Sequence, residues 1–323
     1  MNFVIVGAGA LGSIYAAYLA RSGHQVSLIA RGERAAALAR HGIAIVGEDS
    51  FSVNCNIVTR PETLRQADVL IVAIKTYDTV QALAPLRGLS VKTAFSVQNG
   101  VLKNKQLGDV FGPQATLGAI SMIGGDVLPA KGDLPGAVRY SMAGPTVIGE
   151  LAGGESSRVK ELVDTLVRSG LKARSSDDIT SVEWSKFVGW SGLSTLAVMT
   201  RLPTWRFLVD ADTALIAARV MRETAAVAIR HGVTLQDSGF TSEAFINARE
   251  EDAVTAVQAH GEKMKASAPE FRQSILQDAD RNRRLEVDET LDYTLKLATE
   301  LGVATPTLEL CCRILRVVSR AAG

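Results

Sequence analysis

Short apolar runs separated by helix-length segments dominate the first half of the chain. Four of these runs have the length of a buried strand, and they cover residues 2–6, 24–30, 67–74 and 93–97. Continuous apolar runs that alternate with helical segments are typical of parallel strands covered by helices on both faces. The pattern therefore predicts an α/β domain built on a doubly wound parallel sheet.

Residues 111–150 follow a different pattern, because glycine and proline are frequent and short alternating pieces replace the continuous runs. We interpret the pieces "AVRYSM" and "TVIGEL" as added strands that extend the sheet. A helical segment, "SSRVKELVDTLVRSG", and a short strand, "LKARSS", close the first domain. The polar residues 175–178 then fit a hinge followed by the start of a helix.

The rest of the chain is helical almost throughout, without a repeat or a low-complexity tract. Its first long helix contains "SVEWSKFVGWSGLSTLAVMT", which is apolar on both faces and is therefore expected to be buried. The sequence thus predicts two domains, an α/β domain over residues 1–176 and an all-α C-terminal domain over residues 177–323. A length of 323 residues agrees with this division, because single cores usually stop growing below that size.

Composition excludes several classes of function. Hydrophobic residues make up 47% and charged residues 21% of the chain, and the formal net charge is only +1. A near-neutral protein has no strong electrostatic attraction to nucleic acid or to a membrane surface, so we expect neither as a partner. No apolar run reaches the roughly 18 residues that a transmembrane helix requires.

The cysteines and the first residues point to a compartment. Cys55, Cys311 and Cys312 are odd in number and lack the spacing of metal ligands, which indicates reduced thiols and no metal site. The chain begins directly with a strand-like run, without a basic segment or a cleavage site before it. We therefore expect a cytoplasmic protein.

The segment "GAGALG" follows the first strand and opens a helix, and a second strand comes next. In this setting the motif predicts a Rossmann-type dinucleotide site over Gly7, Ala8, Gly9, Ala10, Leu11 and Gly12. Gly7 would make the tight turn, Gly9 would let the backbone approach a diphosphate, and Gly12 would let the helix pack closely on the strand. The diphosphate would lie at the helix N-terminus, where free amides and the helix dipole favour anions.

The end of the second strand distinguishes NAD from NADP. An NAD site places an acidic residue there, about 20 residues after the loop, to bind the ribose 2′-hydroxyl. Here Arg31 stands nineteen residues after Gly12, and Arg34 follows just beyond. Arginine forms a charge-assisted pair with a 2′-phosphate, and the nearby Glu33 is expected to face solvent. The sequence therefore favours NADP (NADPH), with Arg31 as an ordinary surface residue as the alternative.

Polar residues follow two further strands. Lys75 ends the run "ADVLIVAIK", and Gln98 and Asn99 end "TAFSVQN". Because ligands bind beyond the carboxyl ends of parallel strands, all three side chains are expected to point into the crevice that holds the glycine loop. The alternatives are that Lys75 opens the following helix and that Asn99 with Gly100 forms an ordinary turn.

Lys186 introduces a charge into the apolar helix described above. Spacing by three and four residues places it on one face with Trp190 and Ser194. One interpretation is a lysine whose stem lies on apolar surface while its ammonium group reaches water. The other is a functional amine near the boundary of the two domains.

The segments "VGAGALGSIYAAYLARSGHQVSLIAR", "VAIKTYD", "SVQNG", "GPTVIGE", "DDITSVEWSKF" and "SILQDADRNRRLEVD" together resemble the ketopantoate reductases (2-dehydropantoate 2-reductases). The similarity spans nearly the whole chain. It implies a Rossmann domain followed by a helical domain, with NADPH and the substrate between them. It also implies reduction of a 2-oxo acid to a 2-hydroxy acid, in the pathway to pantothenate and coenzyme A.

The resemblance also implies roles for individual residues. Lys186 would be the general acid that protonates the ketone oxygen, a role typically worth ~10²–10⁴-fold in rate. Asn99 would orient this lysine or the substrate, and Lys75 would contact the cofactor. Glu286 would bind the hydroxyl end of the substrate, with Ser274 near its carboxylate. Without the resemblance, Glu286 would be interpreted as a solvated acid that pairs with Arg283, three residues earlier.

The sequence departs from the family pattern near the proposed acid. Trp190 and Ser194 stand where many members have asparagines that contact the substrate, and Leu291–Asp292 replaces a usual Asn-Gly pair. Trp190 would add apolar bulk at the substrate or represent alternative packing, with Arg201 as a compensating charge. Losing one polar contact costs on the order of 1–3 kcal/mol, so the reaction class is expected to survive better than the choice of substrate.

Three hypotheses remain open from the sequence. The first is an NADPH-dependent reductase with ketopantoate as its substrate, and the second is a reductase of another 2-oxo acid on the same scaffold. The third is a non-catalytic NADPH-binding regulator, against which the presence of Lys186, Asn99 and Glu286 argues. A homodimer is compatible with the apolar helical half, but periodicity does not decide the oligomeric state.

Overall fold

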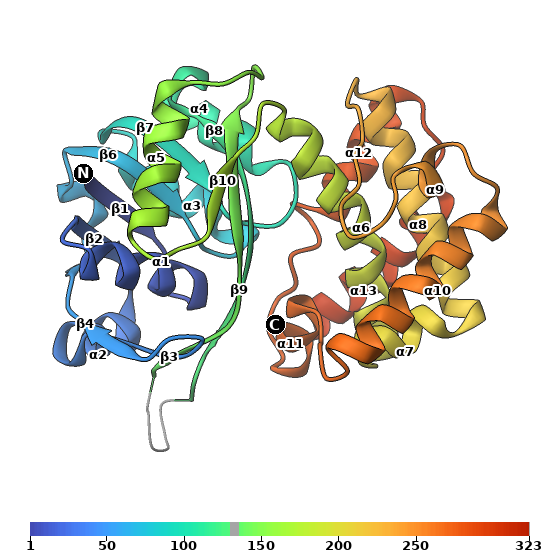
Figure 1. The fold of residues 1–323 in the computed structure, drawn as a ribbon, viewed down its shortest axis with the longest axis horizontal. Coiled ribbons are helices and arrows are strands. Elements are labelled where there is room, and N and C mark those ends of the chain that lie inside the picture. Colours follow the sequence, from blue (N-terminus) through green and yellow to red (C-terminus); the bar gives the residue numbers. More distant parts are fainter. Residues whose placement is uncertain (130–135, 323) are drawn as a thin grey trace. The chain divides into compact units, whose positions relative to one another are not determined.

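The structure is a computed structural model that describes residues 1–129 and 136–322 (Figure 1). Its internal contacts divide the chain into two units. The first unit contains Met1–Asn99 and Lys103–Ile179, and the second contains Gly100–Leu102 and the chain from Thr180 onward. The assignment of these units to cofactor and substrate binding remains a prediction.

The first unit is built on a parallel sheet of five strands in the order β5-β2-β1-β6-β7. These strands are β1 (Asn2–Val6), β2 (Gln25–Ile29), β5 (Asn56–Val58), β6 (Gln66–Val72) and β7 (Ser90–Ser96). The order moves outward from β1 in both directions, which is the arrangement of a doubly wound sheet. The predicted fold class is therefore confirmed for this unit.

Both faces of the parallel sheet are buried, which explains why its strands are continuous apolar runs. Phe3 and Ile5 of β1 belong to one hydrophobic cluster, while Val4 belongs to another on the opposite face. Successive side chains of a strand point to opposite faces, so a strand buried on both sides needs apolar residues at every position. Helices cover the two faces. The helices of the first unit are α1 (Ala10–Arg21), α2 (Gly32–His41), α3 (Thr79–Leu83), α4 (Lys103–Phe111) and α5 (Ser157–Arg168).

A second sheet lies in the same unit, and here the sequence interpretation was wrong. Its strands are β3 (Ile43–Gly47), β4 (Phe51–Val53), β8 (Leu117–Val127), β9 (Val138–Glu150) and β10 (Ala173–Ser175). The pieces "AVRYSM" and "TVIGEL" are parts of the single strand β9, which pairs with β8, β3 and β10 and not with the parallel sheet. Alternating side chains predict a strand, but they do not identify its partner.

Glycine and proline within β9 are accommodated by an irregular pairing with β8. The register shifts between Ser121 and Ile123, opposite the segment that contains Gly144 and Pro145. A Cβ at Gly144 would lie 2.2 Å from the carbonyl oxygen of Met122, so a side chain is excluded there. These residues therefore mark a bulge inside one strand and not the gap between two strands.

The second unit is helical in the part of the chain that the structure describes. Its helices are α6 (Ile179–Thr200), α7 (Thr204–Val209), α8 (Ala211–Arg230), α9 (Glu243–Ile246), α10 (Glu250–Ser267), α11 (Ser274–Asp280), α12 (Leu291–Leu301) and α13 (Pro306–Ala321). The predicted all-α second half is thus confirmed. Short 3₁₀ turns occur only in the first unit among the described residues, at Pro61–Thr63, Thr76–Asp78, Ala84–Leu86 and Pro113–Ala115.

Close packing against α8 fixes α6 at the centre of the second unit. A Cβ at Gly192 would lie 2.7 Å from Met221 and 3.0 Å from the carbonyl oxygen of Ala217, so the two helices approach each other where α6 has no side chain. Both Ala217 and Met221 are fully buried. Trp184 and Val188 on the other face of α6 are buried in the same hydrophobic cluster, which explains why both faces are apolar.

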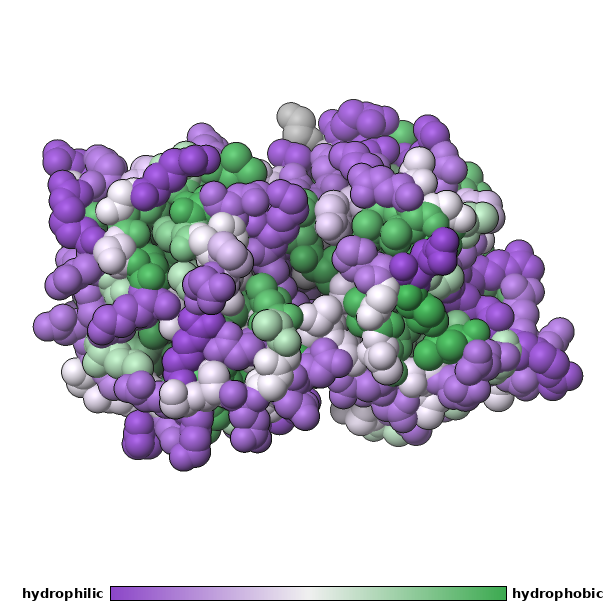
Figure 2. Space-filling model, turned by 90° about the horizontal axis from the view of Figure 1, so that it is seen from above, coloured by the Kyte–Doolittle hydropathy of each residue, from purple (hydrophilic) through white to green (hydrophobic). Residues whose placement is uncertain are grey.

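Polar side chains cover most of the face shown in Figure 2, with apolar residues interspersed among them. Within residues 1–129 and 136–322, no helix has the length and hydropathy needed to span a membrane.

Candidate functional site

The glycine loop connects β1 to α1 and has the close backbone packing that its sequence predicts. Gly7 has a φ of +108°, and a Cβ there would lie 2.8 Å from the carbonyl oxygen of Ala73. A Cβ at Gly12 would lie 1.9 Å from the carbonyl oxygen of Gly7. A side chain is therefore excluded at both positions, because it would push α1 away from the ends of β1 and β6.

Gly9 differs from the other two glycines, because nothing in the protein requires it. Its φ of −72° is open to any residue, and a Cβ built there meets no protein atom within 4 Å. The residue is exposed and forms the N-cap of α1, whose first turn contains Ala10 and Leu11. An exposed glycine at a helix N-terminus fits the approach of a diphosphate, which binds to the free amides of the first turn. The loop residues therefore fit a dinucleotide.

Two arginines near the end of β2 have different environments. Arg31 is exposed and is the N-cap residue of α2, and Glu33 in the first turn of α2 is exposed as well. Arg34 is half-buried and donates hydrogen bonds from Nε to the carbonyl oxygen of Ala8 (3.1 Å) and from Nη2 to Ser13 Oγ (3.3 Å). Burial lowers the pKa of Arg34. Arg34 thus stabilises the glycine loop, while Arg31 points its charge toward solvent.

The stabilising role of Arg34 could not be predicted from the sequence. Its guanidinium also donates from Nη1 to the carbonyl oxygen of Gly136 (2.6 Å), a residue 102 positions away. Two of its three acceptors are backbone carbonyls, which carry no residue-specific signal. The local sequence therefore distinguishes Arg34 from Arg31 only by position.

Lys75 and Asn99 follow neighbouring parallel strands at the same offset. Val72 at the end of β6 pairs with Ser96 at the end of β7. Lys75 and Asn99 come three residues after these paired positions, and both are partly buried. The two residues are therefore placed at the same edge of the sheet, the edge at which ligands bind in doubly wound folds.

Gln98 is directed into the protein, and the expectation that it points into the crevice was wrong. Its side chain is 6% exposed and donates from Nε2 to the carbonyl oxygen of Ile74 (2.9 Å) and to Thr79 Oγ1 (2.8 Å). Its Oε1 accepts from Ser96 Oγ (2.8 Å). A buried amide needs partners for its donors and its acceptor, and Gln98 finds them by joining the ends of β6 and β7.

Lys186 lies on α6 among aromatic side chains. It is the one partly buried residue of the stretch Ser181–Trp190, in which the other nine positions are buried. The ring of Phe187 is stacked on that of Trp190, with centroids 5.6 Å apart, and it meets Trp184 edge-on at 6.0 Å. Lys186 therefore stands on a segment of α6 whose aromatic residues pack on one another, and its residue keeps partial access to solvent.

Trp190 and Ser194 are engaged in the interior of the second unit. Trp190 is 8% exposed and belongs to the large hydrophobic cluster of this unit. Ser194 is fully buried, and its Oγ donates to the carbonyl oxygen of Trp190 (2.6 Å) on its own helix. These contacts favour alternative packing over direct substrate contact as the explanation of both residues.

Glu286 is 4% exposed, so the interpretation of it as a solvated acid was wrong. Arg283, the partner suggested for it by spacing, lies instead 4.0 Å from the carboxylate of Asp278. The backbone of Glu286 begins a turn in which Thr290 Oγ1 donates to its carbonyl oxygen. Ser274 is the first residue of α11 and is exposed.

The turn after Glu286 contains a second carboxylate. Burial raises the pKa of Glu289, and the like charges of Asp288 and Glu286 act in the same direction. Gly100, which groups with the second unit, packs against this turn, since a Cβ there would lie 2.9 Å from Cγ2 of Thr290. Its φ of +80° also requires glycine.

The remaining departures from the family pattern have structural partners. Arg201 directly follows α6 and pairs with Asp280, the last residue of α11, at 3.2 Å, and its side chain is 53% exposed. Leu291 is buried at the start of α12, and Asp292 pairs with Arg316 and with Lys296. None of these contacts points to a ligand.

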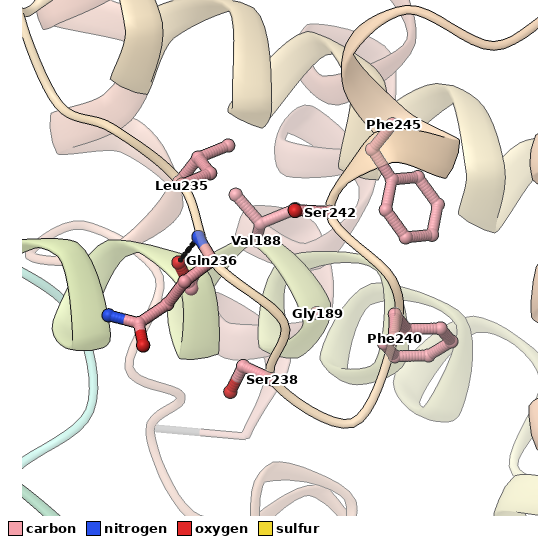
Figure 3. A pocket seen from close by; sticks show the side chains of 9 residues that line it. Val188, Gly189, Leu235, Gln236, Ser238, Phe240, Ser242 and Phe245 are labelled. Atoms are coloured by element: carbon pink, nitrogen blue, oxygen red, sulfur yellow. Dashed lines mark hydrogen bonds between the residues drawn. The ribbon is translucent and has the colours of Figure 1, made fainter.

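A small hollow lies on the second unit beside the residues that flank Lys186 (Figure 3). Ser185 accepts a hydrogen bond there from the backbone amide of Gln236 (2.9 Å), and the ring of Phe240 lies against Gly189. The lining consists of Ser185, Val188, Gly189, Leu235, Gln236, Ser238, Phe240, Ser242 and Phe245. Lys186 does not belong to this lining, so the hollow is distinct from the predicted catalytic position.

Two sequence models of one family match the chain. The family described as "Ketopantoate reductase PanE/ApbA" matches residues 3–153, and its C-terminal counterpart matches residues 178–319. A 2-dehydropantoate 2-reductase from Mesorhizobium japonicum is 27% identical over 343 aligned positions, which cover 98% of this chain and 97% of that protein.

Solved structures of similar proteins share the whole fold. A PanE/ApbA family ketopantoate reductase from Ralstonia eutropha JMP134 has a TM-score of 0.84 and 25% identity, and the match covers 100% of this chain and 99% of the other. A D-mandelate dehydrogenase in complex with NADH and anilino(oxo)acetate also has a TM-score of 0.84, with 21% identity and coverage of 100% and 99%. At that identity the second likeness concerns the fold alone. The chain therefore belongs to the ketopantoate reductase family PanE/ApbA and is an oxidoreductase, of a family that reduces 2-oxo acids with a nicotinamide cofactor.

Proposed function

We propose that the protein reduces a 2-oxo acid to a 2-hydroxy acid with NADPH, and that 2-dehydropantoate is its substrate. The observation that carries this proposal is the partial burial of Lys186 on an otherwise buried stretch of α6. The names of relatives that match nearly the whole chain support the choice of substrate.

The choice of NADPH depends on the residues that follow β2. β2 ends at Ile29, and the next charged side chain is that of Arg31, which is exposed. A carboxylate in this position would repel a 2′-phosphate, whereas a guanidinium forms charge-assisted hydrogen bonds with it. Glu33 is exposed in the first turn of α2 and does not replace the acidic residue of an NAD site.

Gly9 and the amides of Ala10 and Leu11 would hold the diphosphate of the cofactor, on a turn whose close packing requires Gly7 and Gly12. Bound NADPH supplies the hydride for the reduction. Lys75 and Asn99 would contact the cofactor or the substrate at the edge of the sheet.

Lys186 would act as the general acid of the reaction. A ketone that accepts a hydride develops negative charge on its oxygen, and an ammonium group stabilises this charge and donates the proton. The buried neighbours Ser185 and Phe187 fix the part of α6 from which this side chain extends, which favours a defined position of Lys186. Glu286 would bind the hydroxyl end of the substrate, and Ser274 would contact its carboxylate.

A second candidate substrate is a 2-oxo acid with a larger apolar group. Trp190 and Ser194 replace amides of the family pattern with packing residues, which removes polar contacts that would select ketopantoate. The likeness in fold to D-mandelate dehydrogenase agrees with the use of this scaffold for an aromatic substrate.

The test is to mix the protein with NADPH or NADH and a panel of 2-oxo acids, and to follow the absorbance of the reduced nicotinamide. The panel contains ketopantoate, phenylglyoxylate, pyruvate and 2-oxoisovalerate. Turnover of ketopantoate with the highest kcat/KM is the expected result. A preference for phenylglyoxylate would support the second candidate, and no turnover of any acid would overturn the proposed function.

Substitution of Lys186 by methionine tests its role. We expect kcat to fall by ~10²–10⁴-fold, the range for the loss of a positioned acid, with a small change in the affinity for NADPH. Lys296→Met is the matched control, because this lysine lies on α12 with a side chain that is 69% exposed. Full activity of the Lys186 variant would show that another group delivers the proton.

A further inference from the structure

Two lysines on α4 differ sharply in burial although they are two residues apart. Lys103 is 3% exposed, whereas the side chain of Lys105 is 66% exposed and pairs with Asp109 one turn later. Lysine is almost never buried without a reason, because its ammonium group loses hydration that only strong hydrogen bonds replace. The structure therefore raises the question of what Lys103 stabilises.

Lys103 connects the end of β7 to the second sheet. Its Nζ donates hydrogen bonds to the carbonyl oxygens of Gln98 (2.9 Å) and Ala119 (2.5 Å). Ala119 is fully buried in β8, where it pairs with Ile148 of β9, so it is a rigid anchor. The lysine thus ties the segment that follows β7 to β8, a strand that pairs with β9 along its length.

The carbonyl that Lys103 binds belongs to the peptide unit between Gln98 and Asn99. Because a peptide unit is planar, fixing its carbonyl oxygen also fixes the direction of the N–H group and the position of the next Cα. Lys103 therefore fixes the backbone N–H group and the Cα atom of Asn99. A charged donor makes this hydrogen bond stronger than one between neutral groups.

The side chain of Gln98 has the same effect on the neighbouring strand end. Its Nε2 donates to the carbonyl oxygen of Ile74 (2.9 Å), which belongs to the peptide unit that precedes Lys75. Ser96 and Thr79 hold the same amide in place. One buried network, which we call the Lys103–Gln98 clamp, thus contacts the peptide units that precede both Lys75 and Asn99.

We propose that Lys103 is a positioning residue for the reductase reaction, acting through Gln98 on Asn99 and Lys75. The inference rests on the proposed function, in which those two residues contact the cofactor or the substrate. Lys103 itself touches neither. Its contribution is to hold two strand ends in the arrangement that binding requires, so that little freedom is lost when the ligand arrives.

The experiment compares Lys103→Met with Lys105→Met, a matched control on the same helix. NADPH is titrated into each protein by calorimetry, and kcat and KM are measured with the best 2-oxo acid. We expect Lys103→Met to weaken NADPH binding about tenfold, the effect of one charge-assisted hydrogen bond, and to lower kcat. Lys105→Met should change neither value. Unchanged binding and unchanged kcat in Lys103→Met, with only a lower melting temperature, would overturn the proposal.

A double-mutant cycle separates positioning from general destabilisation. If Lys103 acts through Asn99, then Lys103→Met should have a much smaller effect on NADPH affinity and on kcat in an Asn99→Ala background. Additive effects of the two substitutions would show that the lysine does not act through Asn99. Lys103→Arg keeps a charged donor and should recover part of the affinity.

A second variant keeps the proposal testable if Lys103→Met does not fold. Gln98→Met leaves Lys103 and both of its carbonyl acceptors in place but removes the donor to Ile74. It should weaken NADPH binding, and the effect should shrink in a Lys75→Ala background. Additivity in this cycle would count against the clamp. These titrations measure NADPH binding and need no turnover. A protein that reduces no 2-oxo acid would therefore contradict the proposed function but not the effect of the clamp on NADPH binding.

Discussion

The glycine loop and helix α6 present two ways of building a functional position. In the first, the important atoms belong to the backbone, and Gly7 and Gly12 are required by the close approach of other backbone atoms. In the second, the atom proposed as the proton donor is the amine of Lys186, and the helix that carries it is fixed by buried side chains of the second unit. A backbone site is therefore encoded in a short motif, while a side-chain site is encoded in the packing of a whole unit.

The same contrast separates three lysines. Lys103 is buried, Lys186 is partly buried and Lys105 is exposed, yet each lies on a helix. The difference in burial arises from the elements that pack against the helix face that carries each lysine. Substitutions at the two kinds of site should accordingly change different properties of the protein.

Trp190→Ala should produce the largest loss of stability. Removing a buried Trp from a packed core costs about 3–5 kcal/mol, because the cavity collapses only in part. We expect a loss in this range by urea denaturation, together with a small change in the preference among 2-oxo acids. A large change in preference with little loss of stability would show that Trp190 contacts the substrate.

Gly12→Ala and Gly9→Ala should separate folding from binding within one loop. At Gly12 the added methyl group meets the carbonyl oxygen of Gly7, so we expect the free energy of unfolding to fall by about 3 kcal/mol. At Gly9 it meets open space, so stability should stay within about 0.5 kcal/mol while NADPH affinity falls. Denaturant titration and calorimetry measure the two effects, and tight NADPH binding by Gly9→Ala would argue against the cofactor position.

Arg31→Ala should reduce the affinity for NADPH about tenfold, because one charge-assisted interaction with the 2′-phosphate is lost. The affinity for NADH, which lacks this phosphate, should remain unchanged. Arg40→Ala is the control, since Arg40 is exposed near the other end of α2. Equal losses for both cofactors would place Arg31 away from the 2′-position.

Glu150→Gln should give the smallest effect, and its size depends on pH. Glu150, at the end of β9, accepts hydrogen bonds from Arg158 Nε (2.7 Å) and Nη2 (2.5 Å) of α5, and this contact lowers its pKa below the ordinary 4.5. A carboxyl whose pKa is lower in the folded state stabilises the protein above its unfolded pKa, and the stabilisation disappears as the pH falls through the folded pKa.

We therefore expect Glu150→Gln to lower the free energy of unfolding by about 1 kcal/mol at neutral pH. The difference from the unsubstituted protein should shrink in acid, below the ordinary pKa of the carboxyl. Urea denaturation at neutral and acidic pH checks this. A difference that is independent of pH would mean that the contribution of Glu150 comes from packing and not from its charge.

Strand and helix types were predictable, but strand partners were not. Alternating and continuous apolar runs follow from the geometry of single elements, so β1, β2, β6 and β7 and the buried helix α6 could be predicted. The second sheet could not, because β9 pairs with β3, which lies almost a hundred residues earlier in the chain. Pairing depends on the register and on the other elements of the core.

The candidate site shows the same division. The positions of the glycine loop and of Lys75 and Asn99 at one sheet edge follow from the order of strands and turns. The inward direction of Gln98, the burial of Glu286 and the packing of Trp190 do not, since each depends on residues that are distant in the sequence.

The sequence by itself determined the class of fold, the dinucleotide loop and the family, because these depend on backbone stereochemistry and on local patterns of apolar residues. Only the tertiary structure decided that Arg34 supports the loop and that Lys103 anchors the peptide unit before Asn99. Their acceptors are mostly backbone carbonyls, which are chemically the same at every position. The fold alone brings a particular carbonyl to a particular side chain.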